Sequence, residues 1–542
     1  MKFMKLGTKP DTFYTDEAVR SVPSDVPTDL IVRISHTTYL LHKFPLLVKC
    51  GLVQLLCSDG GDNEAGEATP IALHDIPGGE EAFELCAKFC YGITINLSAH
   101  NFVAALSGAK FLRMNESVAK GNFISKLELF FHSCILEGWK DSILTLQAMW
   151  RHSGWSDDHR IVQPCMDSII EKILIHPSQV SWSYTYTRPG YNKKKQKHAV
   201  PKDWWTEDVS DLDLELFRSI ISTVKSTKKL PSALIGEALH VYSCKHMPSP
   251  LELQKQAQSS VNQSNELGMS KHRQVLEAIV SMIPAESRAV SGSFLLRLLE
   301  IAGHVRASSS TRAELVRRSG QQLDEVAASD LLISDIGMVE AVLESFLLQL
   351  CQAVPREETE RVVASMAKVG RIFDSYLQII AGDGALQVSK FIELAGSLPD
   401  MARTEHDGLY QAIDIFLREH PELSKAEKKR LCRMIECRKL SAEARVDAIG
   451  NDQLPLRTIV QLLFIDQETN GGVGAGAGAG AGANQEVSVA KVAAAQDEEK
   501  RSRNRAETRH HHREPALATR AERTRVVPSP SEPTRTIKHV QS

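Results

Sequence analysis

The chain has 542 residues, of which 42% are hydrophobic and 24% are charged, and its formal net charge is −3. This length exceeds what a single hydrophobic core usually serves, so we expect more than one domain. The small net charge argues against a dedicated nucleic-acid-binding protein, and no apolar run reaches the roughly 20 residues that span a bilayer.

The first folded unit is predicted over residues 26–135 and mixes strands with helices. Hydrophobic patterns indicate strands at 29–34, 37–43 and 70–76, and helices at 44–56, 78–92 and 98–112. Gly92 suits a helix end and Ser98 suits a helix start. The residues between 57 and 70 are polar and glycine-rich, as expected for a solvated loop. This part of the chain is predicted to be α+β.

Helical periodicity dominates from Trp139 onward. Residues 136–202 are predicted to form a helical linker region with a basic loop. Its helices are expected at 139–150 and 160–174, and an exposed loop is expected at 183–205. The basic run "NKKKQKH" at 192–198 lies in this loop.

Residues 203–467 are predicted to form an all-helical domain. Broad apolar stripes indicate helices at 211–224, 273–283, 293–305, 338–354 and 361–381. The polar stretch at 247–268 predicts a flexible break. Farther on, Ser424 and Glu427 match the capping box that starts a helix, and Ser441 suits a helix start as well.

Three short helices are predicted between residues 406 and 467, because apolar residues recur there at helical spacing. Their expected buried faces are Leu409, Ile413, Phe416 and Leu417; then Leu431, Met434 and Ile435; and last Leu456, Ile459, Val460, Leu463 and Phe464. A further short helix is expected after Ser441, and Pro455 suits the first turn of the last one. Residues 468–542 begin with a glycine–alanine run, continue with arginine-rich sequence and are predicted to be disordered.

The ten cysteines show neither a CxxC pair nor zinc-ligand spacing. Cys432 and Cys437 would point about 140° apart on a helix. Cys86 and Cys90 share the apolar face of Phe83 and are expected to lie in the core.

No motif of a nucleotide-binding loop, serine hydrolase or zinc protease occurs in the chain. His406, Asp407 and His420 lie at predicted helix starts, where polar residues cap backbone groups. We therefore predict no catalytic residue, no metal site and no cofactor.

Two features leave alternatives open. Trp204 and Trp205 could be an exposed anchor for a partner, but we favour packing against the helix that begins near Asp211. The basic run at 192–198 could contact anionic lipid or direct nuclear import, and it could equally be a solvated loop. The arginine-rich tail lacks the interleaved aromatic residues that stack on bases, so no specific nucleic acid is expected.

Long motifs in the chain resemble known families. Asp29, the strand after it and "LHKFPLL" are similar to the BTB/POZ domain. The segments "PGGEEAFELCAKFCYGI", "DWWTEDVSDLDLELF", "VSKFIELAGSLPD" and "HDGLYQAIDIFLREHPELSKAEKKRLCRMIECRKLS" resemble the plant non-phototropic-hypocotyl/root-phototropism-like family. The resemblance covers about residues 25–467.

This resemblance implies a substrate adaptor of a cullin-3 ubiquitin ligase in plant signalling. The BTB unit would form a homodimer or heterodimer and bind the cullin-3 scaffold, with Asp29 and Lys43 as a charged pair near the dimer interface. The helical domain would engage client signalling proteins such as phototropin-type kinases, in phototropism or auxin transport. Tyr410 matches a tyrosine at which family members are suspected of being phosphorylated, although packing beside Ile413 is the simpler expectation.

The alternative is a signalling scaffold at the plasma membrane that binds kinases or transporters without ligase work. Both hypotheses predict an intracellular protein, either in the cytoplasm or in peripheral contact with the membrane. An enzyme is the third class, and it would need an unfamiliar active site.

Overall fold

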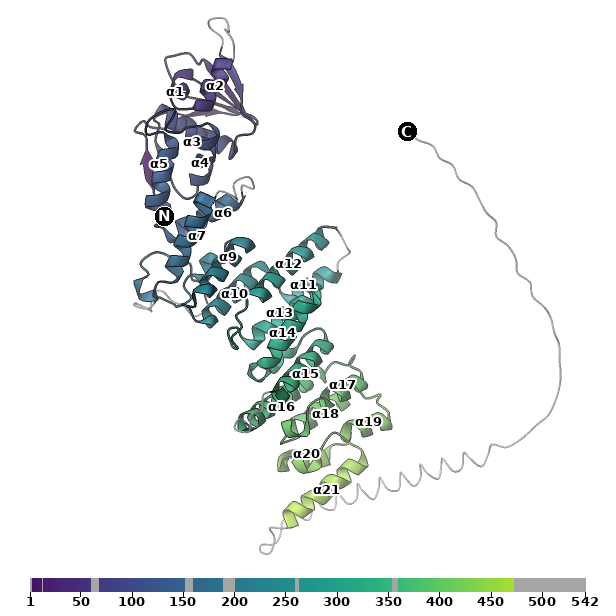
Figure 1. Cartoon of the computed structure of the whole chain (residues 1–542). Helices are drawn as coiled ribbons and strands as arrows, with labels where there is room; N and C mark the ends of the chain where they lie inside the picture. The colour runs from purple at the N-terminus through teal and green to yellow at the C-terminus, as the bar shows by residue number, and fades with distance from the viewer. Residues whose placement is uncertain are drawn as a thin grey trace, which may run out of the picture. The chain divides into compact units, whose positions relative to one another are not determined.

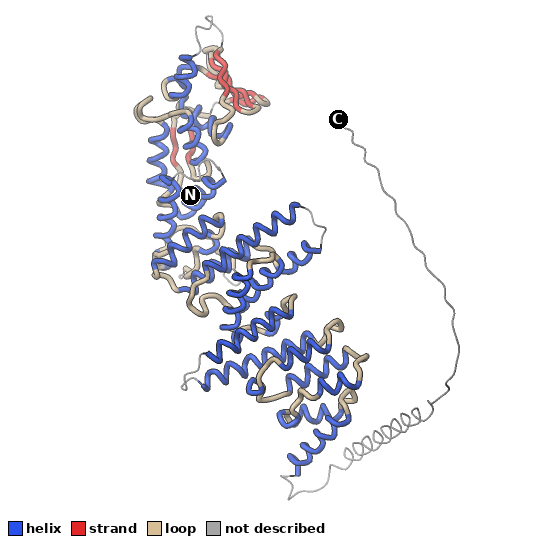
Figure 2. Tube along the Cα trace, turned by 45° about the vertical axis from the view of Figure 1, so that its right-hand side comes forward, coloured by secondary structure: helices blue, strands red, loops and turns tan. Residues whose placement is uncertain are grey.

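The computed structural model describes residues 2–11, 13–59, 68–151, 159–188, 200–258, 263–352 and 359–471. The chain forms two compact units, one ending at Thr404 and the other beginning at Glu405. The first unit contains an N-terminal α/β region followed by a long helical region, and the described part of the second is helical (Figure 2). The predicted order, mixed structure first and helices afterwards, is confirmed. The disorder predicted for the tail falls outside the described residues, except that 468–471 continue the last helix.

The described strands belong to two small sheets near the N-terminus. They are β1 (Met4–Leu6), β2 (Tyr14–Asp16), β3 (Val19–Ser21), β4 (Leu30–Ile34), β5 (Thr37–Leu41), β6 (Thr69–Ala72) and β7 (Ile95–Leu97). One sheet has the strand order β2-β3-β5-β4-β6, and the other pairs β1 with β7. The predicted strand pair is the antiparallel hairpin β4–β5, and β6 joins β4 in parallel. Leu30, Val32 and Ile34 alternate onto the buried face of β4.

The sheet region begins earlier than the expected boundary at residue 26. β1 pairs with β7 in antiparallel fashion, and β3 lies parallel to β5. Each of these early strands has only three residues. Such segments are too short to show an alternating pattern, so the hydrophobic periodicity could not reveal them.

The helices of the α/β region differ in two places from the prediction. They are α1 (Lys43–Leu47), α2 (Gly51–Asp59), α3 (Gly79–Tyr91), α4 (Phe102–Phe111) and α5 (Phe123–Phe130). The single helix expected at 44–56 is therefore two, because the amides of Lys49 and Cys50 both bond to the Leu46 carbonyl oxygen and close α1. Asn101 rather than Ser98 is the N-cap of α4. Gly92 ends α3 as predicted, with a left-handed φ of 70°.

Helices then follow one another through the rest of the first unit (Figure 1). They are α6 (Trp139–Arg151), α7 (His159–Ile173), α8 (Thr206–Val209), α9 (Leu214–Thr227), α10 (Ser232–His246), α11 (Pro250–Gln258), α12 (Gln263–Met282), α13 (Gly292–His304), α14 (Ser309–Gln321), α15 (Ile336–Gln352), α16 (Thr359–Ile380) and α17 (Val388–Gly396). Consecutive helices pack against each other, as α13 does with α14 and α14 with α15. The prediction of a flexible break at 247–268 is wrong for most of these residues, because α11 and α12 contain them. Residues 259–262, between the two helices, lie outside the described residues.

The second unit contains α18 (Asp407–Glu419), α19 (Lys425–Cys432), α20 (Ala442–Gly450) and α21 (Leu456–Gly471). The capping box of Ser424 and Glu427 is confirmed, and so is the Ser441 cap of α20. The predicted face of α18 is fully buried. The face predicted for α21 is only partly right, because Phe464 is 64% exposed while Leu462 is buried.

The two neighbouring tryptophans lie in the core. Trp204 and Trp205 are both almost completely buried. The Trp204 ring contacts Trp139 and Trp182, with ring centroids 4.6 Å and 5.6 Å apart. The predicted burial is confirmed and the exposed anchor is wrong. The ring neighbours of Trp204 come from α6 and from the segment after α7, and packing against α9 stays a prediction.

Candidate protein-interaction site

Asp29 and Lys43 lie together at the start of α1. The Asp29 carboxylate accepts a hydrogen bond from the Lys43 backbone amide at 2.6 Å. This bond satisfies one of the amides that a helix start leaves without a partner. The structure thus brings the two residues together through the lysine main chain. Their role at a dimer interface remains a prediction.

A second set of contacts holds α1 in place. The backbone amide of His42 donates to the Tyr91 hydroxyl at 2.7 Å, and the His42 Nδ1 lies 3.1 Å from the same oxygen. The other ring nitrogen of His42 lies 3.0 Å from the carbonyl oxygen of Val26. Burial raises the pKa of Tyr91 to about 12, so its hydroxyl stays neutral at physiological pH. These bonds connect the start of α1 to the end of α3.

The helices α1 and α2 expose large apolar side chains. Phe44 is 78% exposed, and Val48, one helical turn later, is 44% exposed. Leu55 and Leu56 on α2 are also exposed, and α2 contacts α1. Exposed apolar side chains that gather on neighbouring elements mark protein-interaction surfaces. We call these four residues the α1–α2 face.

Sequence reasoning missed this face. The sequence predicts a single helix at 44–56, with Leu47, Leu52 and Leu55 on or near one side. A usable signal was present, because "FPLLVKCGLVQLL" carries more apolar residues than one buried stripe needs. Only the break between α1 and α2 decides which of them remain exposed.

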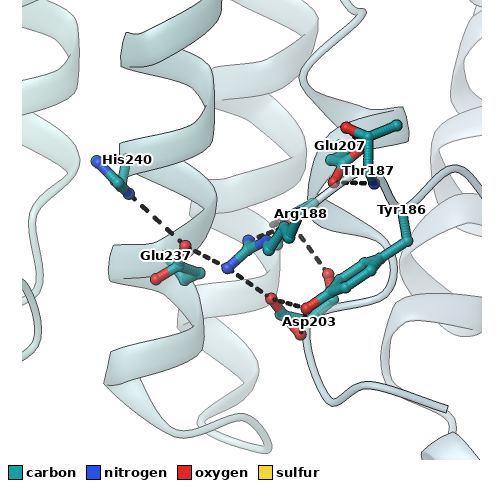
Figure 3. A network of polar contacts seen from close by, with 8 residues as sticks. Tyr186, Thr187, Arg188, Asp203, Glu207, Glu237 and His240 are labelled. Carbon is teal, nitrogen blue, oxygen red and sulfur yellow. Dashed lines mark hydrogen bonds and ion pairs between the residues drawn. The ribbon is translucent and has the colours of Figure 1, made fainter. Parts of the chain in front are cut away.

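A polar network holds Tyr186, Thr187 and Arg188 against the residues that follow them in the chain (Figure 3). The Arg188 guanidinium lies 2.9 Å from the Asp203 carboxylate and 2.6 Å from the Glu237 carboxylate on α10. The Tyr186 hydroxyl also donates to Asp203, at 3.3 Å. This segment belongs to the loop that was expected to be exposed at 183–205. That expectation is wrong for 184–186 and for Arg188, which are half-buried against the folded helices, whereas Thr187 is exposed as expected.

Two further carboxylates complete the docking of this segment. The amide of Thr187 donates to Glu207 of α8 at 2.8 Å, and the amide of Thr185 donates to Asp208 at 3.1 Å. Asp208 is buried and also accepts the indole N–H of Trp139 at 2.7 Å. The basic run at 192–198 lies outside the described residues.

Tyr410 lies on α18 in the second unit and is almost completely buried. Its hydroxyl donates to the Asp447 carboxylate at 2.7 Å, and Asn451 bridges to the hydroxyl and to Asp414. Burial, the first cause, raises the pKa of Tyr410, and the neighbouring carboxylates add to the rise. The expected packing of the residue is therefore observed. Its phosphorylation remains a prediction.

The other polar residues noted in the sequence have structural contacts. Asp407 accepts the Ser441 amide at 2.9 Å, and the His406 ring accepts the Glu436 amide at 3.1 Å. His420 caps the end of α18 rather than the start of a helix. Among the described residues, no group of His, Cys, Asp and Glu is arranged to hold a metal ion.

The chain is similar to known proteins along most of its length. A model of the NPH3 family matches residues 203–445. A BTB/POZ domain-containing protein of Arabidopsis thaliana is 53% identical over 482 residues, which cover 86% of this chain and 85% of the relative. The chain belongs to the NPH3 family. Its match to the family begins at Asp203, the residue that receives Arg188 in the polar network.

Two other relatives from Arabidopsis thaliana carry more specific names. The phototropic-responsive NPH3 family protein NPY1 is 38% identical, with 86% of this chain and 82% of the relative covered. Root phototropism protein 3 is 32% identical, with 85% of this chain and 76% of the relative covered. No solved structure matches this NPH3-family chain significantly. Across the part of the chain that the structure describes, no helix is both long and apolar enough to cross a membrane.

Proposed function

We propose that this NPH3-family protein is a substrate-specific adaptor of a cullin-3 ubiquitin ligase. In this proposal the N-terminal α/β region is a BTB/POZ domain that pairs two chains and binds the cullin-3 scaffold. The helical region from Asp203 onward recruits the client protein for ubiquitination. The protein itself would make and break no covalent bond, so it needs no catalytic residue and no cofactor.

One observation carries the proposal: an α/β region with an exposed apolar α1–α2 face precedes an NPH3 domain. The relatives with the same arrangement of matched residues are named BTB/POZ domain-containing proteins. Pairing two chains through the α1–α2 face would bury Phe44 and Leu55, whose exposure otherwise costs free energy. Asp29 and Lys43 would lie at the edge of this interface, where they hold the start of α1.

The relatives' names support a proposal for the client and the pathway. Two relatives are named for phototropism, and the proposal therefore extends to client proteins of light or auxin signalling, including phototropin-type kinases. Co-purification of clients from plant tissue with the full chain would test it.

A pull-down with purified cullin-3 tests the ligase role. The full-length chain, shown to be folded by circular dichroism, is expected to retain cullin-3, whereas a different cullin serves as the specificity control. Failure of the folded, dimeric chain to retain cullin-3 would remove the ligase role and favour the alternative, a scaffold for kinases or transporters at the plasma membrane. That alternative rests on the same helical domain together with two basic segments, the run at 192–198 and the arginine-rich tail. It predicts binding to anionic vesicles that weakens steeply with salt.

A further inference from the structure

Three chemically active side chains meet on α10 and α13, beside the Arg188 network. The Sγ of Cys244 lies 3.5 Å from the Nε2 of His240, one helical turn earlier on α10. The Arg297 guanidinium of α13 reaches the same sulfur at 3.3 Å. Cys244 therefore lies between an imidazole and a permanent positive charge.

The imidazole of His240 is itself oriented. Its Nδ1 lies 3.6 Å from the Glu237 carboxylate, which in turn is paired with Arg188 (Figure 3). The ring also packs edge-on against Phe294 of α13, with centroids 5.0 Å apart. Glu237, His240 and Cys244 follow one another at helical spacing along one side of α10. In this order they match a group that orients a base, the base and a nucleophile.

The electrostatics of the cluster favour an ionised thiol. The hydrogen bond with His240, followed by the charges of His240 and Arg297, lowers the pKa of Cys244. The bond to Cys244 and the Glu237 contact raise the pKa of His240 to about 9. A thiolate beside a protonated imidazole is the state that attacks electrophiles, because the thiolate rather than the thiol is the nucleophile.

Four other described cysteines are less exposed than Cys244, and their thiol pKa values are raised rather than lowered. Cys50, Cys86 and Cys165 are buried, and the pKa of each thiol is raised. Burial also raises the pKa of Cys57, which is only partly exposed. Among the cysteines whose side chains the structure describes, Cys244 alone is exposed.

We propose that Cys244 is a site of oxidative modification by hydroperoxides, made reactive by His240 and Arg297. The thiolate sulfur attacks one oxygen of hydrogen peroxide, so an S–O bond forms and the O–O bond breaks. The departing hydroxide takes a proton from the His240 imidazolium and leaves as water. Sulfur is oxidised by two electrons to a sulfenic acid, and the peroxide is reduced to water.

Oxidation would change the contact between α10 and α13. A sulfenic acid is neutral, so it no longer attracts the charges of His240 and Arg297 as a thiolate does. The modification would therefore weaken the contact between α10 and α13 and change the surface that these two helices offer to a partner.

The test uses the reduced, full-length protein. It is exposed to limiting hydrogen peroxide at pH 7 in the presence of dimedone, which traps sulfenic acids, and each cysteine is quantified by peptide mass spectrometry. We expect the Cys244 peptide to be labelled before those of Cys57 and Cys134. Equal or slower labelling of Cys244 would overturn the proposal.

Variants separate a reactive cluster from simple exposure. Because a thiol of ordinary pKa near 8.5 is only a few per cent ionised at neutral pH, His240→Gln and Arg297→Gln should each slow alkylation of Cys244 by iodoacetamide at pH 7 by roughly three- to tenfold. Lys245→Gln is the matched control, because Lys245 is adjacent on α10 but pairs with Asp211. Melting curves check that each variant is folded. An unchanged rate in both folded test variants would contradict the assigned roles.

Discussion

The contacts of the Tyr410 hydroxyl restrict its phosphorylation. In sequence it lies in a polar helix start, but in the structure its hydroxyl links α18 to Asp447 of α20. A phosphate on this oxygen would place about two negative charges beside Asp447 and Asp414. Phosphorylation would therefore separate α20 from α18, and it requires a prior opening of this contact.

The Tyr410 contact can be tested without phosphorylation. Tyr410→Phe removes the hydroxyl and is expected to destabilise the packing of α20 by about 1 kcal/mol, because one hydrogen bond to a charged acceptor near the surface is lost. Hydrogen exchange followed by mass spectrometry should show faster exchange in the peptide over 442–450. Tyr14→Phe is the control, since the Tyr14 ring is 61% exposed on β2. If the exchange of this peptide is unchanged, the hydroxyl contributes little.

At the scale of elements, one buried ion pair joins three segments of the first unit. The Arg403 guanidinium lies 2.8 Å from the Asp374 carboxylate of α16 and donates to the Ala395 carbonyl oxygen of α17 at 2.6 Å. It follows directly after the short helix η6 (Asp400–Ala402). Gly370 lets α16 approach this helix, because a Cβ there would meet the Ala402 carbonyl oxygen. Both charged groups are almost completely buried.

Breaking this pair on one side is expected to be costly. Asp374→Asn leaves the buried Arg403 charge without its counter-ion and should destabilise the first unit by about 3 kcal/mol. The double variant Asp374→Leu with Arg403→Met should lose less, since it leaves no unpaired charge. Thermal unfolding followed by circular dichroism measures both.

The control for this prediction is Glu137→Gln. Glu137 pairs with Lys2, and both side chains are more than half exposed. Such a pair contributes about 0–1 kcal/mol, so its removal should hardly change the melting temperature. A similar loss in Asp374→Asn and Glu137→Gln would show that burial does not strengthen the Arg403 pair.

At the scale of the whole molecule, the proposed adaptor depends on pairing of two chains. The α1–α2 face is the described surface that best supports such pairing, because Phe44 and Leu55 are exposed on adjoining helices. Light scattering should therefore give about twice the chain mass of 60.0 kDa. A monomer at micromolar concentration would contradict this prediction.

Charged substitutions locate the interface. Phe44→Asp and Leu55→Asp should each shift the protein toward the monomer, because burying a carboxylate without a partner is unfavourable. Leu332→Asp introduces the same change at an exposed leucine elsewhere in the chain and should leave the dimer intact. A dimer that survives both α1–α2 substitutions must use another surface.

The amino-acid sequence by itself determined local features of this protein. Helix ends such as Gly92 and the capping box of Ser424 and Glu427 were predictable, because they depend on residues within one turn. The same is true of the hairpin β4–β5 and of the buried face of α18. The family was identifiable as well, since it rests on long runs of matched residues.

Only the tertiary structure decided which polar and apolar residues meet. It exposed Phe44 and Phe464, docked Arg188 on α10, and joined Cys244 to Arg297 across 53 positions of sequence. It also added strands of three residues to the two sheets, and no local pattern indicates these strands. The physical reason is that each of these outcomes depends on a partner distant in sequence, and periodicity along one segment carries no information about that partner.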